Sequence, residues 1–254
     1  MRTIEIIVFG NIPFSGQSGD QIVSKAITTA IAALFKKTGK LQANLRVEPV
    51  AKLLQGSIDG FDFFGNGMLM YNGLRIEGME LYLQAVSIDF SAIFSGKVKL
   101  RQPTQASLRI ILTEEDLTTS FNTPFIVEKL QRLEYQGQPL HFHNTQITIN
   151  EDKSLTIKAD IRIGNNQEII SINIGANLEV QGRTKIQFTN PQYQGNNEAN
   201  LLGQALINHV NNLLDLDKFA LDGTCLRVDR ARIKDKEFVF YGTAEISHFP
   251  QRKI

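Results

Sequence analysis

The chain has 254 residues, and its 27 Lys and Arg residues against 26 Asp and Glu residues give a formal charge of +1. This balance excludes a strongly basic nucleic-acid binder and an acidic tail protein, because both carry a large excess of one charge. Hydrophobic residues make up 42% of the chain, which argues against disorder. The single cysteine, Cys225, excludes an internal disulfide framework. We therefore expect a globular protein with no nucleic-acid partner.

The first predicted helix begins after Gly19, where Ser18 and Gln21 form a capping-box pattern, and ends at Gly39. Residues 1–17 are predicted to form an N-terminal strand and loop, since Ile4–Phe9 is too short and too charged for a signal peptide. Apolar residues recur through the helix at spacings of three and four: Ile22, Val23, Ala26, Ile27, Ala30, Ile31, Leu34 and Phe35. This periodicity predicts an amphipathic helix.

Two more helices are predicted further along the chain. One begins at Thr113 with a capping box, is interrupted at Pro124 and continues to Leu133. The other runs from Asn197 to Leu216. Its apolar stripe consists of Leu201, Leu202, Ala205, Leu206, Val210, Leu213 and Leu214. Each of these helices has one face suited to packing against a sheet.

Nearly all other segments alternate apolar and polar residues, which is typical of strands with one buried face. The segments are 106–112, 155–163, 170–174, 178–180 and 186–188, followed by a hairpin of residues 226–246 that turns at Lys234–Lys236. Within residues 74–90 the apolar parity changes near Gly78 and near Ala85, which predicts β-bulges. The resulting sheet should curve strongly.

No linker rich in Pro, Gly or Ser divides the chain, so residues 1–254 are predicted to form a single domain. The predicted fold is α+β, with a long, strongly curved antiparallel sheet wrapped around amphipathic helices, because its apolar face must be covered. Incomplete filling of the concavity would leave an elongated apolar groove suited to acyl chains. Its predicted lining is Ile27, Ile31, Leu34, Leu206, Val210 and Leu213. A fully packed core is the alternative.

The residues that carry chemistry do not assemble into a catalytic or metal site. His141 and His143 share a strand face, but a zinc site needs at least a third ligand. The acidic run Glu114–Asp116 lies in the first turn of a predicted helix, where the helix dipole favours carboxylates. Cys225 has apolar neighbours and is expected to be structural. We expect no enzyme activity, no metal and no cofactor.

Two features favour contact with a membrane. The segment Phe61–Tyr71 crowds aromatic and Met residues around Asn66-Gly67, which indicates a hairpin with an apolar tip, the rim of a lipid groove, or ordinary core. Basic residues alternate with apolar ones in Lys97–Arg101 and Arg230–Lys236, either facing lipid phosphates or forming a solvated strand face. The predicted docking set is Phe63, Phe64 and Met68 as the tip, with Lys97, Lys99 and Arg101 facing headgroups.

Five segments, taken together, carry a family resemblance: Lys52–Asp59, Gly73–Ile76, Val86–Phe90, Gly96–Ala106 and Leu112–Leu117. In order and spacing they resemble the LmeA-like phospholipid-binding family, with the closest likeness to its branch from photosynthetic bacteria. The resemblance covers most of the chain, from about residue 18 to residue 246. It implies a curved sheet wrapped on helices, similar to tubular lipid-binding proteins, and phospholipid binding without catalysis.

The exported members of that family carry a secretion signal, from which this sequence departs. We therefore expect a cytoplasmic protein that holds a phospholipid or similar amphiphile in an apolar groove, docks peripherally on a membrane surface and transfers the lipid. The alternative is an interaction or assembly protein at a photosynthetic membrane, with a packed core and no lipid cavity.

Overall fold

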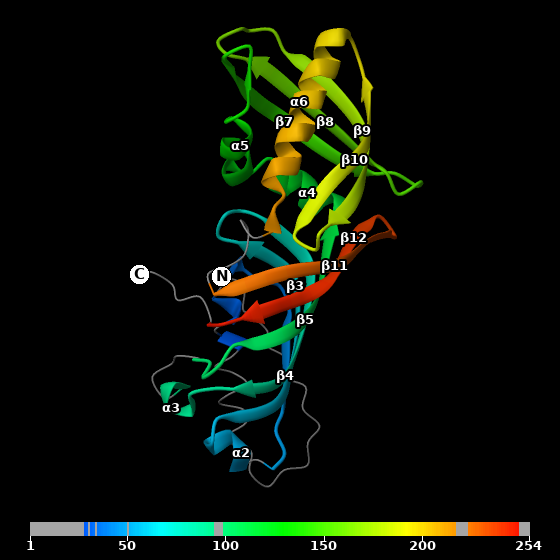
Figure 1. Ribbon diagram of the computed structural model, residues 1–254. Helices are drawn as coiled ribbons and strands as arrows, with labels where there is room; N and C mark the ends of the chain where they lie inside the picture. Colours follow the sequence, from blue (N-terminus) through cyan, green and yellow to red (C-terminus); the bar gives the residue numbers. More distant parts are fainter. Residues whose placement is uncertain are drawn as a thin grey trace.

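The computed structural model describes residues 28–29, 31–33, 35–49, 51–93, 99–216 and 223–248. The predicted residues 1–17 and the predicted helix start at Ser18 lie outside this part of the chain. The strands form two antiparallel sheets, the smaller lying beyond one end of the larger (Figure 1). The predicted α+β class and strongly curved antiparallel sheet are confirmed, with the strands divided between two sheets.

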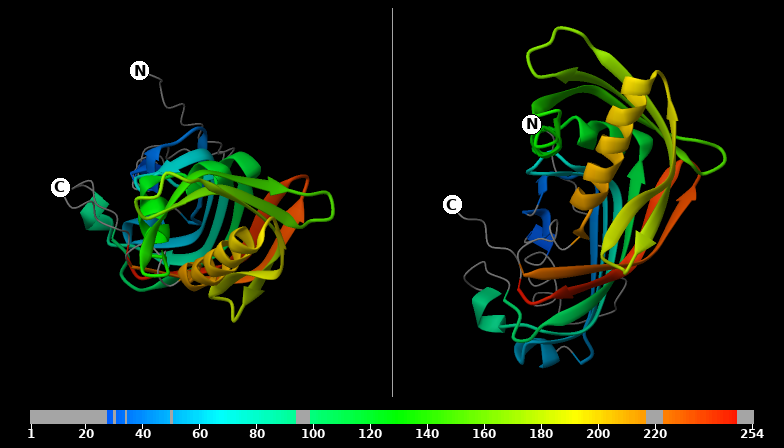
Figure 2. Two further views of the ribbon diagram at one scale, coloured as in Figure 1. Left: turned by 90° about the horizontal axis from the view of Figure 1, so that it is seen from above. Right: turned by 45° about the horizontal axis from the view of Figure 1, so that its top comes forward.

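The large sheet contains β1 (Phe35–Lys37), β2 (Leu41–Arg46), β3 (Ser57–Met70), β4 (Arg75–Ser87), β5 (Thr104–Thr113), β11 (Thr224–Lys234) and β12 (Glu237–Ile246). Its strand order is β1-β3-β4-β5-β12-β11, with β2 also paired to β3. Seen along its axis, this sheet curls strongly (Figure 2). Alternate side chains of β3, such as Phe61 and Phe63, therefore point into the first hydrophobic core.

The small sheet contains β6 (Glu134–Tyr135), β7 (Gln138–Ile149), β8 (Leu155–Ile163), β9 (Ile170–Gln181) and β10 (Lys185–Gln194), in the order β10-β9-β8-β7-β6. The predicted strands 170–174 and 178–180 are one continuous strand, β9. Strict alternation in β8 buries Leu155, Ile157, Ala159 and Ile161 in a second core.

Three long strands of the large sheet, β5, β11 and β12, contribute side chains to both cores. In β5, Ala106 and Leu108 belong to the first core, whereas Leu112 packs against the second. In β12, Ala244 belongs to the first core and Phe238 to the second. The two cores are therefore connected by continuous backbone in paired strands rather than by a flexible linker.

The parity changes predicted near Gly78 and Ala85 are present, but without a one-residue register shift. The paired residues of β3 and β4 keep one register from Ser57–Ser87 to Leu69–Arg75. Instead, the backbone turns left-handed at Ala85, with φ 53°, and at Gly67 of β3, with φ 58°. The inward-facing positions of β4 change parity at Ala85, from Leu83 to Val86. The prediction of register-shifting bulges in this ladder was wrong.

Two other predicted elements differ from the structure. Asn66-Gly67 lies inside β3, with Asn66 paired to Gly78, so it is not a hairpin turn. The connection from β3 to β4 comes later, where the Asn72 side chain accepts a hydrogen bond from the Leu74 backbone. The first predicted helix does not continue to Gly39, because residues 35–37 form β1 and bury Phe35 against β3.

Besides the helical residues 28–29 and 31–32, the described helices are α2 (Ala51–Leu54), α3 (Phe90–Ile93), α4 (Glu114–Phe121), α5 (Pro124–Leu130) and α6 (Asn197–Leu213). The capping box of Thr113 and Asp116 and the break before Pro124 are confirmed. The third helix ends at Leu213 rather than Leu216, because the following residues hydrogen-bond to the start of β10. In the described part of the chain no helix is both long and apolar enough to cross a membrane.

Helix α6 packs across the inner face of β9 and β10 (Figure 1). Gly203 permits this close approach, since a Cβ there would lie 3.0 Å from the Tyr193 ring and 3.2 Å from Ile174 Cδ1. At the other end of the helix, the Asn211 side chain hydrogen-bonds to both the N–H and the C=O of Phe188. These bonds occupy part of the free edge of β10.

Side chains of α4 cover the edge of β7, on the side of the small sheet opposite β10. The Thr118 hydroxyl accepts from the Ile147 N–H at 3.0 Å and donates to the Ile147 carbonyl at 3.2 Å. Asn122 makes the same paired contacts with the backbone of Thr145, and Glu114 accepts from the Ile149 N–H at 2.8 Å. These three side chains lie one turn apart on the helix, matching alternate residues of β7.

The other face of α4 contacts the large sheet at the start of β4. The Arg75 guanidinium, at the start of β4, contacts Asp116 at 3.2 Å and Glu115 at 2.8 Å. The Arg75 backbone N–H donates to the Ser120 hydroxyl. Asp116 is almost wholly buried, and it also completes the capping box. Helix α4 therefore joins the two sheets through polar contacts on both of its sides.

Candidate functional site

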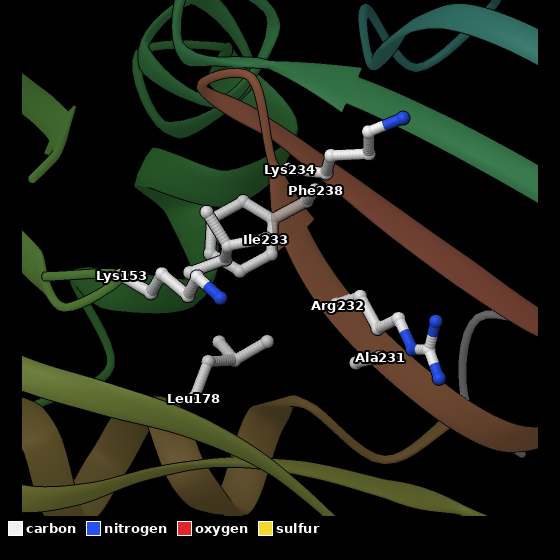
Figure 3. Close-up of a pocket in the computed structure, with 7 residues that line it drawn as sticks. All are labelled: Lys153, Leu178, Ala231, Arg232, Ile233, Lys234 and Phe238. Atoms are coloured by element: carbon white, nitrogen blue, oxygen red, sulfur yellow. The ribbon is translucent and has the colours of Figure 1, made fainter. Parts of the chain in front are cut away.

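A pocket of about 480 Å³ lies between the tip of the β11–β12 hairpin and the small sheet (Figure 3). This volume falls in the range of small-molecule binding sites. The pocket is lined by Lys153, Leu178, Ala231, Arg232, Ile233, Lys234 and Phe238. Four of these residues are apolar and three are cationic, which divides the lining into an apolar floor and a basic rim.

The apolar floor is formed where the two sheets meet. Phe238 is the most buried member, and its ring stacks on Phe240 at a centroid distance of 6.1 Å. Ile233 is paired with Phe238 across the hairpin, and Leu178 comes from β9. Ile233 and Leu178 are only partly buried. Apolar surface therefore remains available in the pocket for a ligand to cover.

The basic rim is supplied by the β7–β8 turn and by the edge strand β11. Lys153 lies in the β7–β8 turn, Lys234 lies beside the β11–β12 turn, and Arg232 lies on β11, at the edge of the large sheet. Figure 3 shows the Lys153 ammonium reaching toward Ile233 and Leu178, whereas the other two side chains extend outward. All three rim side chains are exposed.

One side of this region is fixed by contacts between the sheets. Arg183, in the β9–β10 turn, forms an ion pair with Asp229 at 2.5 Å, and its carbonyl accepts from the Val228 N–H at 2.8 Å. Asp229 lies at an irregularity in β11, because the register against β12 shifts between Val228 and Arg230. These contacts hold β11 against the β9–β10 hairpin.

The residues predicted to line a groove are divided between the two cores. Ile31 is buried in the first core, whereas Leu206 and Val210 are buried in the second core and Leu213 packs against its edge. Ile27 and Leu34 lie outside the described residues. The structure therefore does not bring Ile31 together with the α6 residues on one surface, and a lipid-lining role for this set stays a prediction.

The predicted apolar tip is not exposed in this structure. Phe63 is 0% exposed and Met68 is 1% exposed, because both project from β3 into the first core. Phe64 points to the other face of the sheet, where its ring makes an edge contact with Tyr82 at a centroid distance of 5.6 Å. Of the three readings of this segment, the burial of Phe63 and Met68 matches ordinary core.

Phe64 belongs to a row of side chains that crosses the outer face of the large sheet. Neighbouring strands place Phe64, Glu80, Arg109, Tyr241 and Arg230 directly opposite one another in turn. Arg109 pairs with Glu80 at 2.5 Å, and the Arg230 guanidinium lies 4.4 Å from the centre of the Tyr241 ring. Burial of Arg109 favours a lower pKa, but the hydrogen bond and charge attraction to Glu80, together with the contact with Tyr241, outweigh this and raise the pKa. Arg230 is thus held on the outer face of the sheet by its contact with Tyr241.

The predicted headgroup-facing residues have different surroundings. Lys97 lies outside the described residues, Lys99 is exposed, and Arg101 is exposed but donates to the Gln55 carbonyl at 2.7 Å. Arg101 thereby caps the end of α2. Beside this contact lies Leu54, which is 71% exposed. Sequence reasoning missed Leu54, although the pair Leu53-Leu54 in so short a helix requires one of the two to face outward.

The residues weighed for chemistry have structural surroundings. Glu114 and Asp116 cover the edge of β7 and cap α4, as described above. His141 and His143 lie on the outer face of β7, opposite Arg162 and Asp160. Across the ranges that the structure describes, no three His, Cys, Asp or Glu side chains gather as a metal site.

The chain matches a family model over most of its length. The model described as LmeA-like phospholipid-binding matches residues 17–243, nearly the whole chain. The matched range contains all the residues that line the pocket, the helix caps described above and both sheets almost in full. Searches of curated proteins and of solved structures returned no match.

Proposed function

Because this chain belongs to the LmeA-like phospholipid-binding family, we propose that it binds one phospholipid or similar amphiphile without catalysis and carries it between membranes. The observation that supports this proposal is the partly exposed apolar floor of the pocket between β9 and the β11–β12 hairpin. An acyl chain is the complementary ligand for such a surface, because it removes both apolar surfaces from water.

The expected binding energy is sufficient for a carrier. Burying about ten methylene groups contributes about 8 kcal/mol before the cost of ordering the chain. A pocket of about 480 Å³ covers part of a lipid rather than all of it. The remainder then stays accessible, which suits a protein that must also release its ligand at a membrane.

We propose that docking uses the α2 end of the large sheet rather than the predicted Phe63 tip. Leu54 supplies the exposed apolar side chain, and Lys99 and Arg101 are exposed nearby in the chain segment that contacts α2. Lys52 is engaged with Asp59 at 2.9 Å, a contact that lowers the pKa of Asp59. One inserted Leu contributes about 1.5–3 kcal/mol and each basic residue about 1 kcal/mol, so docking is reversible.

The pocket assignment is tested by filling the pocket. Ile233→Trp places a larger ring on the floor, and Ile169→Trp makes the same change at an exposed loop position as a control. Native mass spectrometry after incubation with a defined phospholipid should show one bound lipid in the wild type and the control, and a strong loss in Ile233→Trp. Equal occupancy in both variants would overturn the pocket assignment. A folded wild type that takes up no lipid would favour the packed-core alternative.

The docking assignment is tested with two matched Leu variants. Leu54→Ser removes the exposed side chain of α2, whereas Leu201→Ser removes one that is 45% exposed on α6. Co-sedimentation with vesicles containing anionic lipid should fall several-fold for Leu54→Ser alone, and should weaken with salt, because charge contacts are screened within about 8 Å at physiological ionic strength. An equal fall in both variants would contradict docking through α2.

A further inference from the structure

We infer that the pocket between β9 and the β11–β12 hairpin selects an amphiphile with an anionic headgroup, bound by Lys153 and favoured by the positive charge of Arg232 at the rim. This inference rests on the proposed lipid binding and adds the chemical class of the headgroup. The starting observation is the composition of the lining. Three of its members are cationic, none is acidic, and the remainder are apolar.

Among the residues that the structure describes, no carboxylate forms an ion pair with Lys153 or Arg232 of the rim. Within the part of the chain that the structure describes, neither Lys153 nor Arg232 has a side-chain hydrogen bond or ion pair. The Lys234 ammonium lies 3.8 Å from the Asp235 carboxylate, which is a long ion-pair distance, and both side chains are about four-fifths exposed. A ligand phosphate would therefore meet donors that are not already occupied.

Two neighbouring carboxylates, Asp229 and Asp152, have partners of their own. Asp229 is paired with Arg183 at 2.5 Å. Asp152, next to Lys153 in the chain, accepts hydrogen bonds from the hydroxyl and N–H of Ser154, and these bonds lower its pKa. Asp229 and Asp152 thus each face a donor of their own, and the residues that line the pocket offer a ligand positive charge alone.

The turn that carries Lys153 does not require a lysine. Lys153 has a φ of 67°, a conformation that favours Gly or Asn over residues with long side chains. The turn itself is closed by other groups, since the Asn150 amide donates to the hydroxyls of Ser154 and Thr156. The fold therefore gives no reason for a lysine here, whereas its ammonium reaches toward Leu178 and Ile233 (Figure 3).

The combination of an ammonium group above an apolar floor matches an amphiphile with a negatively charged head. Phosphate oxygens accept charge-assisted hydrogen bonds from Lys and Arg, and these are stronger than neutral ones. Leu178, Ile233 and Phe238 then contact the first methylenes below the head. Free phosphate would satisfy the cations alone and leave this floor exposed to water.

The test compares three ligands by isothermal titration: short-chain phosphatidylglycerol, short-chain phosphatidylcholine and inorganic phosphate. The variant is Lys153→Asn combined with Arg232→Gln, and the control is Lys158→Asn, an exposed lysine on β8. Asn suits the left-handed position 153, so the variant should fold, as checked by its unfolding midpoint. The wild type and control should bind the anionic lipid at least tenfold more tightly than the zwitterionic lipid, and the variant should lose this preference while keeping its affinity for phosphatidylcholine.

Each result has one consequence. Equal affinities of the wild type for both lipids would overturn the headgroup inference and leave the proposed lipid binding intact. Binding of neither lipid by folded protein would overturn the proposed function and the inference with it. Phosphate that binds as tightly as the anionic lipid would also overturn the inference, because the apolar floor would then contribute nothing. Loss of the preference in Lys158→Asn as well would assign it to overall charge rather than to the rim.

Discussion

Replacing Thr118 by Val removes the hydroxyl through which α4 contacts the edge of β7. That hydroxyl accepts from the Ile147 N–H at 3.0 Å and donates to the Ile147 carbonyl at 3.2 Å. Val has nearly the same shape as Thr and a similar helix propensity, so the change isolates the hydrogen bonds. It leaves both backbone groups of Ile147, a residue that is 1% exposed, without these partners.

The expected cost follows from the two groups left unpaired. A buried donor or acceptor that loses its partner costs about 1–3 kcal/mol. Because Thr118 is only half-buried and the edge of β7 can admit some water, we expect a loss of about 2–3 kcal/mol in the free energy of unfolding. Thr119→Val is the matched control on the same helix, and it should change stability by less than about 0.5 kcal/mol.

Urea denaturation of the wild type and of both variants provides the measurement. The slope against urea should stay the same, and only the midpoint of Thr118→Val should fall. Equal midpoints for the two variants would show that the side chains of α4 do not stabilise the edge of β7. The same argument applies to Asn122, which makes the corresponding paired contacts with Thr145.

Three further predictions concern other parts of the molecule. Gly242→Ala should destabilise by about 3 kcal/mol or more, because a Cβ there would lie 2.0 Å from the Arg227 carbonyl oxygen; thermal unfolding checks this. Hydrogen bonds from Asn144 and then Ser171 lower the pKa of Asp160 below 3.8, so its stabilising effect is complete above that pH and is lost as the pH falls through the lowered value. The difference in unfolding free energy between wild type and Asp160→Asn should therefore be present at pH 5 and shrink below about pH 4. Because β5, β11 and β12 contribute to both cores, unfolding followed by fluorescence and by far-UV circular dichroism should give one coincident transition, as a single domain requires; two separated transitions would show two domains.

Local signals in the sequence predicted local structure well. The capping box of Thr113 and Asp116, the break at Pro124 and the turn of the β11–β12 hairpin depend on neighbouring residues, and all three are confirmed. Alternation in β8 also identified its buried side chains, because one sheet face is apolar along its whole length.

The sequence was less informative where two patterns fit one segment. Phe35 continues the helical spacing of the preceding residues, but it also fits a strand, and pairing with β3 decides the outcome. Gly67 resembled a turn residue because it follows Asn66. In the structure Gly67 has a left-handed backbone but lies within the strand β3. In both cases a partner strand distant in sequence determines the conformation.

The pocket could not be predicted for a similar reason. Lys153, Leu178 and Arg232 come from a turn, a central strand and an edge strand, and they meet only because the two sheets share an interface. The basic run around Arg232 was visible in the sequence. Nothing in that run indicated that Arg230 would stack on Tyr241 while Arg232 would have no ion-pair partner among the described residues.

The pairing of β5 with β12 determines the order in which this protein can fold during synthesis. Thr113 pairs with Glu237, so the edge of β5 leaves the ribosome about 120 residues before its partner strand. At typical rates of chain elongation this interval is on the order of 10 s. The entire small sheet and α6 are synthesised within it and can form first. The large sheet is therefore completed by the last hairpin to emerge, and until then the edge of β5 that pairs with β12 has no partner strand.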